Sequence, residues 1–242
     1  MSRGLTGLVL KGYGAKDYQL TLLGKQSIAP HFVRFRFSSP QLLQEIEWHP
    51  ATWLRFWFPD THGKRKEVQR AYTLVAAYPA QGEFEIDVLL HQPPGPATLW
   101  FESAQPGHQL TGTFLGSRFR MPHPEPASFL LIGDACSTPA INNLIAAAQP
   151  STPLEVYLES NDAHDATIPL ASHPQLTLQR VPRRGPESLL AAIPHRPRAG
   201  WFAWAAGEAG TLKLLHHALR SEHGFDKERM HVQSYWSETA KH

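Results

Sequence analysis

The chain has 242 residues, enough for one large or two ordinary domains, with 42% hydrophobic and 18% charged residues, as in soluble globular proteins. Its formal net charge of +2 excludes the concentrated basic surface of a nucleic-acid-binding protein. No segment reads as a signal peptide or a membrane span, and the single cysteine, Cys136, excludes an internal disulfide, so we expect a cytoplasmic protein.

The first half of the chain has the period-two pattern of half-buried strands. In the segment 53–58, Leu54, Phe56 and Phe58 fall on one face and Arg55 on the other. Residues 31–37 and 83–90 alternate in a similar way, and turn-rich stretches separate these segments. The pattern predicts an antiparallel barrel or sandwich, with one helix that starts near Pro96.

After a proline-rich joint at residues 121–126, the pattern changes to continuous apolar runs that alternate with helices. The predicted strands are 129–132, 154–158, 176–181, 201–206 and 230–235, and the predicted helices are 139–148, 186–193 and 209–222. This alternation is typical of a parallel sheet with helices on both faces. We therefore expect two domains, residues 1–120 and 121–242.

One candidate site in the first half is the sequence Arg70-Ala71-Tyr72-Thr73. On a strand, Arg70 and Tyr72 project to the same side, where a guanidinium can bind a phosphate and a tyrosine ring can stack on a flat conjugated ring. Thr73 points to the other side. The three residue types suit a flavin with its phosphate tail, although such a tetrapeptide is also common in ordinary strands.

A second candidate site lies about twenty residues further on. After the strand 83–90, His91 is followed by a Gly95-Pro96 turn that opens a helix. A helix start exposes unpaired backbone amides at its positive end, which favours an anion such as the pyrophosphate of a dinucleotide. Because consecutive strands carry the two candidates, they can converge on one ligand.

Together these motifs resemble the siderophore-interacting protein family, within the larger ferredoxin-reductase-like group. The resemblance covers nearly the whole chain in the expected order: Arg70-x-Tyr72-Thr73, Asp87 through His91, Gly95-Pro96-Ala97 with Trp100, Gln105-Pro106-Gly107, Gly133-Asp134 with Pro139-Ala140-Ile141, Ala206 through Gly210, and Tyr235-Trp236. The family pattern is not complete. A second arginine often follows the threonine, where this chain has Val75, and Ser237 stands where many members have a basic residue.

The resemblance implies a reductase in which the barrel binds FAD and the α/β domain binds NADH or NADPH, with reduced ferredoxin as an alternative donor. Tyr72 and Thr73 would lie at the reactive flavin. The cofactor-binding residues that it implies are Arg70, Tyr72, Thr73, Asp87, His91, Gly95, Pro96, Ala97, Thr98, Trp100, Gly133, Asp134, Ser137, Thr138, Gly207, Glu208, Ala209 and Trp236.

The implied substrate is a ferric siderophore, which would be reduced so that iron leaves as Fe(II). A flavin accepts hydride and releases electrons singly, so the reaction requires no metal ligand of the protein's own. An anionic substrate favours nearby positive charge, and the candidates are Arg55, Arg34, Arg36, Arg118 and Lys241. The alternatives are electron exchange with a ferredoxin-type carrier and a siderophore-binding protein that has lost the flavin; we expect a monomer.

The choice between NADH and NADPH depends on residues near the ends of the second and third strands of the α/β domain. Glu159 ends the second strand, and an acid there binds a ribose diol and repels the extra phosphate. Arg180, Arg183 and Arg184 could instead receive that phosphate. We lean towards NADH, and we expect Cys136 to be a buried structural residue.

Overall fold

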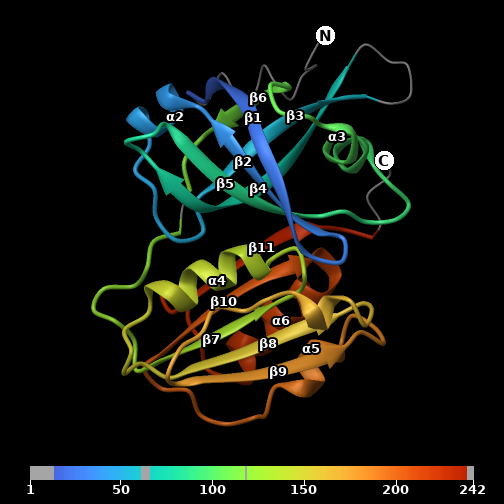
Figure 1. The fold of residues 1–242 in the computed structure, drawn as a ribbon. Coiled ribbons are helices and arrows are strands. Elements are labelled where there is room, and N and C mark those ends of the chain that lie inside the picture. The colour runs from blue at the N-terminus through green and yellow to red at the C-terminus, as the bar shows by residue number, and fades with distance from the viewer. Residues whose placement is uncertain (1–13, 61–65, 118, 239–242) are drawn as a thin grey trace. The chain divides into compact units, whose positions relative to one another are not determined.

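A computed structural model describes residues 14–60, 66–117 and 119–238 of the chain (Figure 1). The chain divides into two compact units, Met1–Arg118 and Phe119–His242. Each unit has its own sheet and its own core.

Unit 1 is a closed antiparallel barrel with the strand order β1-β2-β5-β4-β3-β6. Its strands are β1 (Lys16–Ala29), β2 (Phe32–Ser38), β3 (Trp53–Pro59), β4 (Glu67–Tyr78), β5 (Glu83–Leu89) and β6 (Gln109–Phe114), and its helices are α2 (Pro40–Glu45) and α3 (Pro96–Ser103). The prediction of an antiparallel barrel is confirmed.

The barrel interior is filled by the side chains that the period-two pattern placed on one face. Leu54, Phe56 and Phe58 of β3 are fully buried, and aromatic rings from β2 and β5 pack against Phe56 across the barrel interior. Gly112 of β6 lies where a Cβ atom would come within 2.6 Å of the Leu54 side chain and 2.7 Å of the Leu20 side chain. The tight interior therefore requires glycine at this position.

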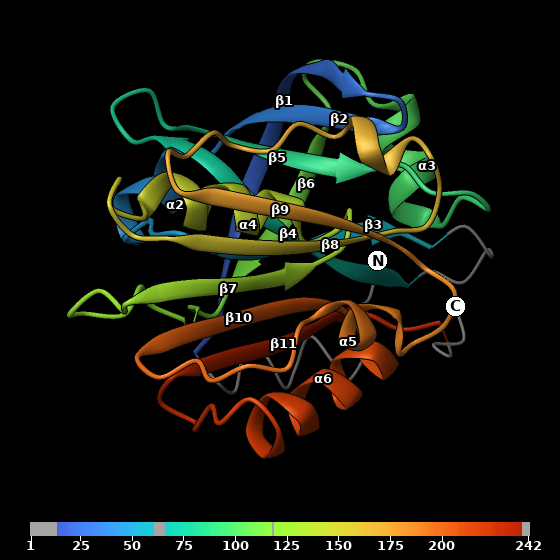
Figure 2. The ribbon, with the colours of Figure 1, turned by 90° about the horizontal axis from the view of Figure 1, so that it is seen from below.

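Unit 2 is a five-stranded parallel sheet with the order β11-β10-β7-β8-β9, which Figure 2 shows side by side. Its strands are β7 (Ser128–Gly133), β8 (Leu154–Ser160), β9 (Leu176–Pro182), β10 (Trp201–Glu208) and β11 (Met230–Trp236). Its helices are α4 (Thr138–Ala147), η1 (Asp165–Thr167), α5 (Ser188–Ala192) and α6 (Ala209–Ser221). The predicted strands and helices of this half are confirmed.

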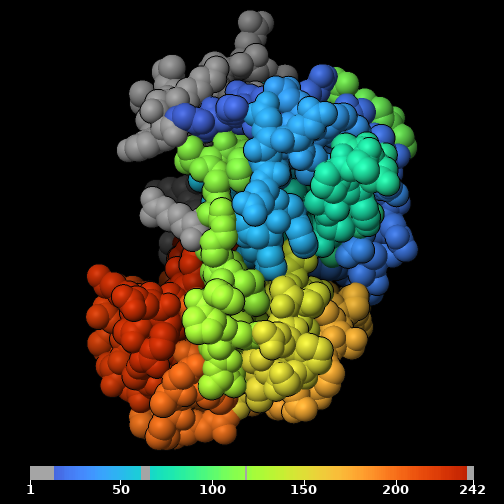
Figure 3. Space-filling model, turned by 90° about the vertical axis from the view of Figure 1, so that its left-hand side faces the viewer, coloured from blue at the N-terminus to red at the C-terminus, as the bar shows by residue number. Residues whose placement is uncertain are grey.

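Helices cover both faces of the sheet in unit 2. Leu130 and Ile132 of β7 share a buried cluster with Leu189 of α5 and Leu212 of α6. Alternate residues of β7 face the opposite helix, α4 (Figure 1), so that a Cβ atom on Gly133 would come within 2.8 Å of Ile141. In the space-filling view, the C-terminal part of unit 2 (red) lies on one side and the part coloured yellow, near residue 150, lies on the other (Figure 3). The carboxyl ends of all five strands lie at the same edge of the sheet, because the strands are parallel.

The sequence analysis did not identify β1, β6 or α2. β1 has 14 residues and two register irregularities, and five of its last seven residues are Gly24, Lys25, Gln26, Ser27 and Ala29, so its alternation is weak. α2 is one short helix of six residues that begins at Pro40. None of the helices in the described parts of the chain is both long and apolar enough to cross a membrane.

Candidate functional site

Strand β4 places the residues of the Arg-x-Tyr-Thr motif on two faces of the barrel. Tyr72 pairs with Leu54 of β3 and Arg70 pairs with Phe56. Tyr72 and Arg70 therefore project to the same side of the sheet as Leu54 and Phe56, the side that forms the barrel core. Thr73 pairs with Trp53, on the opposite face, and is buried. The predicted division of the motif between two faces is therefore seen in the structure.

The Tyr72 ring brings the motif next to helix α3. Its ring centroid lies 5.3 Å from that of Phe101 in α3 and 5.4 Å from that of Phe56, in both cases edge to face. Trp100 of α3 packs beside Phe58, with ring centroids 6.0 Å apart. Tyr72 is only partly buried, which leaves part of the phenol open beside this aromatic cluster.

The start of helix α3 has the features of an anion-binding site. Gly95 is its N-cap residue, and no side chain caps the helix start. The amides of Ala97 and Thr98 are in the first turn, and Leu99 N donates to Gly95 O at 3.0 Å. An uncapped helix start carries positive partial charge with unpaired N–H donors.

The His91 side chain lies against this helix start. Its Nδ1 lies 2.9 Å from Pro93 O, which fixes a proton on Nδ1 and leaves Nε2 as an acceptor in the neutral ring. A Cβ atom on Gly95 would lie 3.6 Å from His91 Cε1, so the glycine is in van der Waals contact with the ring. Arg70 Nη1 donates a hydrogen bond to the carbonyl of Gln69, and the other N–H groups of the guanidinium make no hydrogen bond to the described residues. These residues fit the phosphates of a dinucleotide cofactor.

Arg55 makes no ion pair with an acidic side chain of the described residues, in contrast to Arg34 and Arg36 on β2. Its guanidinium carbon lies 4.3 Å from the centroid of the Trp53 ring, a cation–π contact. Burial lowers the pKa of Arg55. No hydrogen bond or ion pair holds its N–H groups within residues 14–60, 66–117 and 119–238. The stacked guanidinium therefore presents free donors in its own plane.

Arg34 and Asp87, predicted to bind substrate and cofactor respectively, bind each other. Arg34 Nε and Nη2 donate to the two Asp87 carboxylate oxygens at 2.7 and 2.9 Å across the β2–β5 pair. The hydrogen bond to Asp87 raises the pKa of Arg34. The Asp87 side chain is 3% exposed, which gives its carboxylate a structural role in the barrel. Sequence spacing did not reveal the pair because the two strands are far apart in the chain.

In unit 2, three segments meet at the carboxyl edge of the sheet. The Asp134 carboxylate follows β7, is buried, and accepts hydrogen bonds from Ser137 N at 3.0 Å and from Trp236 Nε1 at 2.7 Å. Burial raises the pKa of Asp134, and these hydrogen bonds oppose that effect. Thr138 Oγ1 donates to the Asp134 carbonyl. The structure thus joins the turn that contains Asp134, Ser137 and Thr138 to Trp236, which is about one hundred residues away in the sequence.

Two features of this turn were not expected. Gly207 at the end of β10 lies where a Cβ atom would come within 2.9 Å of Asp134 Oδ2, so glycine is needed for the carboxylate to sit there. Cys136 is exposed, and the expectation of a buried cysteine is wrong. It follows a residue whose side chain turns inward, and the short turn directs Cys136 to solvent instead.

Glu208 and Ala209 form the second strand-to-helix turn of this edge. Glu208 is the N-cap of α6, and its Oε2 accepts a hydrogen bond from Thr211 N at 2.9 Å. Its other oxygen accepts one from Glu238 N at 3.3 Å. The α6 start is therefore capped by an acidic side chain, in contrast to the α3 start in unit 1.

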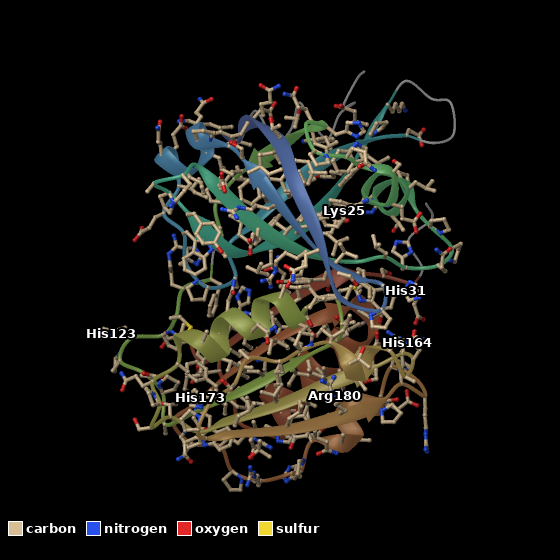
Figure 4. The ribbon with its side chains drawn as sticks, viewed as in Figure 1. Lys25, His31, His123, His164, His173 and Arg180 are labelled. Carbon is tan, nitrogen blue, oxygen red and sulfur yellow. The ribbon has the colours of Figure 1, made fainter. Side chains whose placement is uncertain are left out.

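Glu159, at the end of β8, is paired and buried beneath Arg183. Arg183 Nη1 lies 2.5 Å from Glu159 Oε2 and its Nη2 lies 2.7 Å from Glu238 Oε1. Burial raises the pKa of Glu159, and Arg183 opposes that shift. Arg180 of β9, labelled in Figure 4, donates to the carbonyls of Asp165 and Ile168. Glu159, Arg180 and Arg183 therefore already have partners in the protein.

Arg118 and Lys241 lie outside the described residues. Pro96 and Ala97 are in the first turn of α3, as the sequence indicated. Within the described residues, no three His, Cys, Asp or Glu side chains gather in a way that could hold a metal ion.

Sequence reasoning missed the acidic residues in the loop after β8. Asp162 Oδ1 accepts hydrogen bonds from His164 N at 2.6 Å and Asp165 N at 3.3 Å, and Asp165 Oδ2 accepts one from Asn161 N at 2.7 Å. The available signal was two aspartates three residues apart directly after a strand, a pattern typical of Asx turns.

Comparison with protein families matches both halves of the chain. Residues 126–239 match a family described as siderophore-interacting protein, and residues 60–113 match one described as siderophore-interacting FAD-binding domain. The two matches lie in unit 2 and unit 1 respectively. The FAD-binding match includes Arg70, Tyr72, Thr73 and the start of α3.

Three similar proteins illustrate these matches. The mycobactin import ATP-binding/permease protein IrtA of Mycobacterium tuberculosis is 47% identical over 239 residues, and the match covers 98% of this chain but only 28% of that protein. Ferric vibriobactin reductase ViuB of Vibrio cholerae is 30% identical over 183 residues, which cover 72% of this chain and 66% of ViuB. A solved siderophore-interacting protein from Acinetobacter baumannii has a TM-score of 0.80 and 19% identity, over 94% of this chain and 92% of that one.

Proposed function

This chain belongs to the siderophore-interacting protein family, and from that premise we propose that it is an FAD-containing reductase. It would transfer electrons from a reduced nicotinamide to a ferric siderophore and release iron as Fe(II) in the cytoplasm. The chain spans 28% of the length of the mycobactin import protein that it matches, and the proposal concerns only these 242 residues.

The observation that carries the proposal is the open start of helix α3 beside the Arg-x-Tyr-Thr motif. The uncapped amides of α3 and the Arg70 guanidinium would hold the FAD phosphates. The open part of the Tyr72 ring, supported edge-on by Phe101, would contact the flavin. When bound, FAD supplies the conversion of a two-electron hydride into single electrons.

The face of β3 and β4 that carries Arg55 suits the substrate. Thr73, which the family resemblance places at the reactive edge of the flavin, pairs with Trp53, and Trp53 stacks on Arg55. The free N–H groups of Arg55 would bind the anionic oxygen atoms of a siderophore. The same strand pair would then hold the substrate next to the electron source.

The reaction balances without a catalytic acid or base from the protein. One hydride carries two electrons, and two ferric complexes each accept one, so each turnover of nicotinamide reduces two iron ions and releases one proton. Oxygen ligands bind iron less strongly after its charge falls from +3 to +2, and the metal can leave. The protein's part is to bind and orient the reactants.

The names of two relatives agree with the proposed reduction of a ferric siderophore. One is a ferric vibriobactin reductase of Vibrio cholerae, and another, from Acinetobacter baumannii, is named ferric acinetobactin reductase and is 21% identical over 230 residues. Their substrates belong to those proteins. For this chain we propose only the class, an iron(III) complex with anionic oxygen ligands.

The test is anaerobic visible spectroscopy of the purified protein. Flavin bands should bleach with NADH or NADPH and return after addition of ferric desferrioxamine or a ferric tris-catecholate, while an Fe(II) chelator develops colour. Flavin that only dithionite reduces would point to a protein electron donor of the ferredoxin type. Protein that contains no flavin and takes up none from added FAD would refute the proposal and favour a siderophore-binding protein.

A further inference from the structure

The carboxyl edge of the sheet in unit 2 is unusually acidic for a site that meets phosphates. Among the described residues, the edge carries seven carboxylates in its strands or in the segments that follow them, Asp134, Glu159, Asp162, Asp165, Glu187, Glu208 and Glu238. Three guanidinium groups accompany them, those of Arg180, Arg183 and Arg184. Seven carboxylates and three guanidinium groups leave a surplus of four negative charges in the described part of this edge.

The backbone amides that would cradle a phosphate at this edge are already bound by these carboxylates. After β7, Asp134 Oδ1 accepts from Ser137 N, and the next amide of the turn, Thr138 N, donates to the Asp134 carbonyl. After β10, Glu208 accepts from Thr211 N. In a dinucleotide-binding domain, amides of such turns bind the pyrophosphate.

The loop after β8 follows the same pattern. Asp165 Oδ2 accepts hydrogen bonds from Asn161 N and Asp162 N at 2.7 and 3.4 Å, and Asp162 binds the next amides. In folds of this kind the ribose of the adenosine half lies near the end of the second strand. An added 2′-phosphate would therefore meet carboxylates at this edge.

The arginines of this edge do little to offset that charge. Arg183 is shared between Glu159 and Glu238, and Arg180 binds two carbonyl groups of the β8–β9 connection, in which Figure 4 labels His164. The Glu159 side chain is 1% exposed, and its Oε1 is buried without any hydrogen-bond donor. Arg184 is exposed after β9 and is a cation of the described part of this edge that a phosphate could reach.

The start of helix α3 in unit 1 differs from this acidic edge in how its amides are capped. The α3 start in unit 1, where the FAD phosphates are proposed to bind, has no side-chain cap, whereas α6 is capped by Glu208. Building on the proposed function, we infer that the acidic edge of unit 2 selects NADH over NADPH by charge repulsion of the 2′-phosphate.

The expected size follows from Coulomb's law. A phosphate of charge about −2 at roughly 10 Å from one uncompensated carboxylate is disfavoured about 1.5-fold at 0.15 M salt and about 2.7-fold at 0.01 M. Asp134 is left out because its carboxylate is buried and bound by Ser137 N and Trp236 Nε1, so three charges of the surplus remain. Selectivity for NADH should then be about three-fold at 0.15 M salt and about twenty-fold at 0.01 M.

This salt dependence separates charge repulsion from recognition of the ribose hydroxyl groups. A hydrogen bond to the 2′-hydroxyl would discriminate equally at both salt concentrations, since it is a short-range contact. The measurement is the second-order rate of anaerobic flavin reduction by NADH and by NADPH, in the FAD-loaded protein, at 0.01 and 0.15 M salt.

Two variants sharpen the test. Glu208→Gln keeps an oxygen that can cap Thr211 N but removes one charge, and it should lower the selectivity at 0.01 M salt from about twenty-fold to about seven-fold. Glu238→Gln, whose side chain is exposed, should act in the same direction if Glu208→Gln does not fold. Glu228→Gln is the matched control, because Glu228 precedes β11 and so belongs to the opposite edge.

The outcomes are distinct from those of the proposed function. Selectivity for NADH that falls with salt and with Glu208→Gln, but not with Glu228→Gln, supports the inference. Equal rates with NADPH at 0.01 M salt, or a selectivity that salt does not change, would overturn it. If neither nucleotide reduces a flavin that dithionite reduces and ferric desferrioxamine reoxidises, the inference fails while the flavin reductase stands.

Discussion

Replacing Arg34 with methionine should destabilise the barrel and leave substrate binding nearly unchanged. The sequence alone placed Arg34 among the substrate-binding residues, but its guanidinium makes two hydrogen bonds to Asp87. The Asp87 side chain is 3% exposed, and without Arg34 its carboxylate would be left buried and unpaired. The methionine side chain keeps most of the apolar contacts of the arginine stem.

The magnitude follows from the exposure of the pair. Removing one partner of a fully buried ion pair costs about 3–5 kcal/mol. The Arg34 side chain is 35% exposed, so solvent screens part of the interaction and about 2 kcal/mol is a better figure. For a unit of this size we expect the melting temperature to fall by about 8 °C.

The assay is thermal unfolding of the Arg34→Met variant next to Arg36→Met on the same strand. The Arg36 side chain is 47% exposed and pairs with Glu83, so its loss should cost about 0.5 kcal/mol or less. The double variant Arg34→Met/Asp87→Asn should be no less stable than Arg34→Met, because the buried charge of Asp87 is removed with its partner. An unchanged melting temperature together with a raised KM for the ferric siderophore would refute the reasoning and return Arg34 to the substrate site.

Three further predictions use other parts of the molecule. Arg70→Ala should weaken FAD binding by about ten-fold or more, seen as a lower ratio of absorbance at 450 to that at 280 nm; full flavin content would contradict the phosphate assignment. Arg55→Ala should raise the KM for ferric desferrioxamine about ten-fold with flavin retained, whereas Arg36→Ala should not. Burial, with Arg198 nearby, lowers the pKa of His223 in the folded protein. Unit 2 should therefore lose stability as the pH falls below about 6.5, because the unfolded chain then binds a proton that the folded chain does not. Denaturant titrations should show that the free energy of unfolding falls less steeply with falling pH in His223→Gln, and equal slopes for the two proteins would oppose this account.

The fold was predictable where burial imposes a period on the sequence. The apolar face of β3 and the continuous apolar run of β7 follow directly from a barrel interior and from a sheet covered on both faces. β1 was not predictable in the same way. It bends through two irregularities and exposes much of its length, so its residues do not alternate regularly.

The candidate site was predictable as a set of short motifs and not as a set of contacts. Local rules placed Tyr72 and Thr73 on opposite faces of one strand, and a glycine before a proline marked the start of α3. The pairing of Arg34 with Asp87 depends on the register between β2 and β5, which no local pattern states. The cation–π contact between Arg55 and Trp53 depends on side-chain conformation as well.

The same limit explains why the sequence alone did not decide between NADH and NADPH. Glu159 was read as a ribose ligand because it ends the second strand, but the structure gives one of its oxygens to Arg183 and buries the other. Under the inference of NADH selectivity, a 2′-phosphate would meet not one residue but the sum of the charges that five parallel strands bring to one edge. Such a sum needs the topology, since its members are spread from Asp134 to Glu238 and look ordinary one at a time. Electrostatic selectivity in this unit is thus a property of the sheet edge, and its dependence on salt is the signature that distinguishes it from a single hydrogen bond.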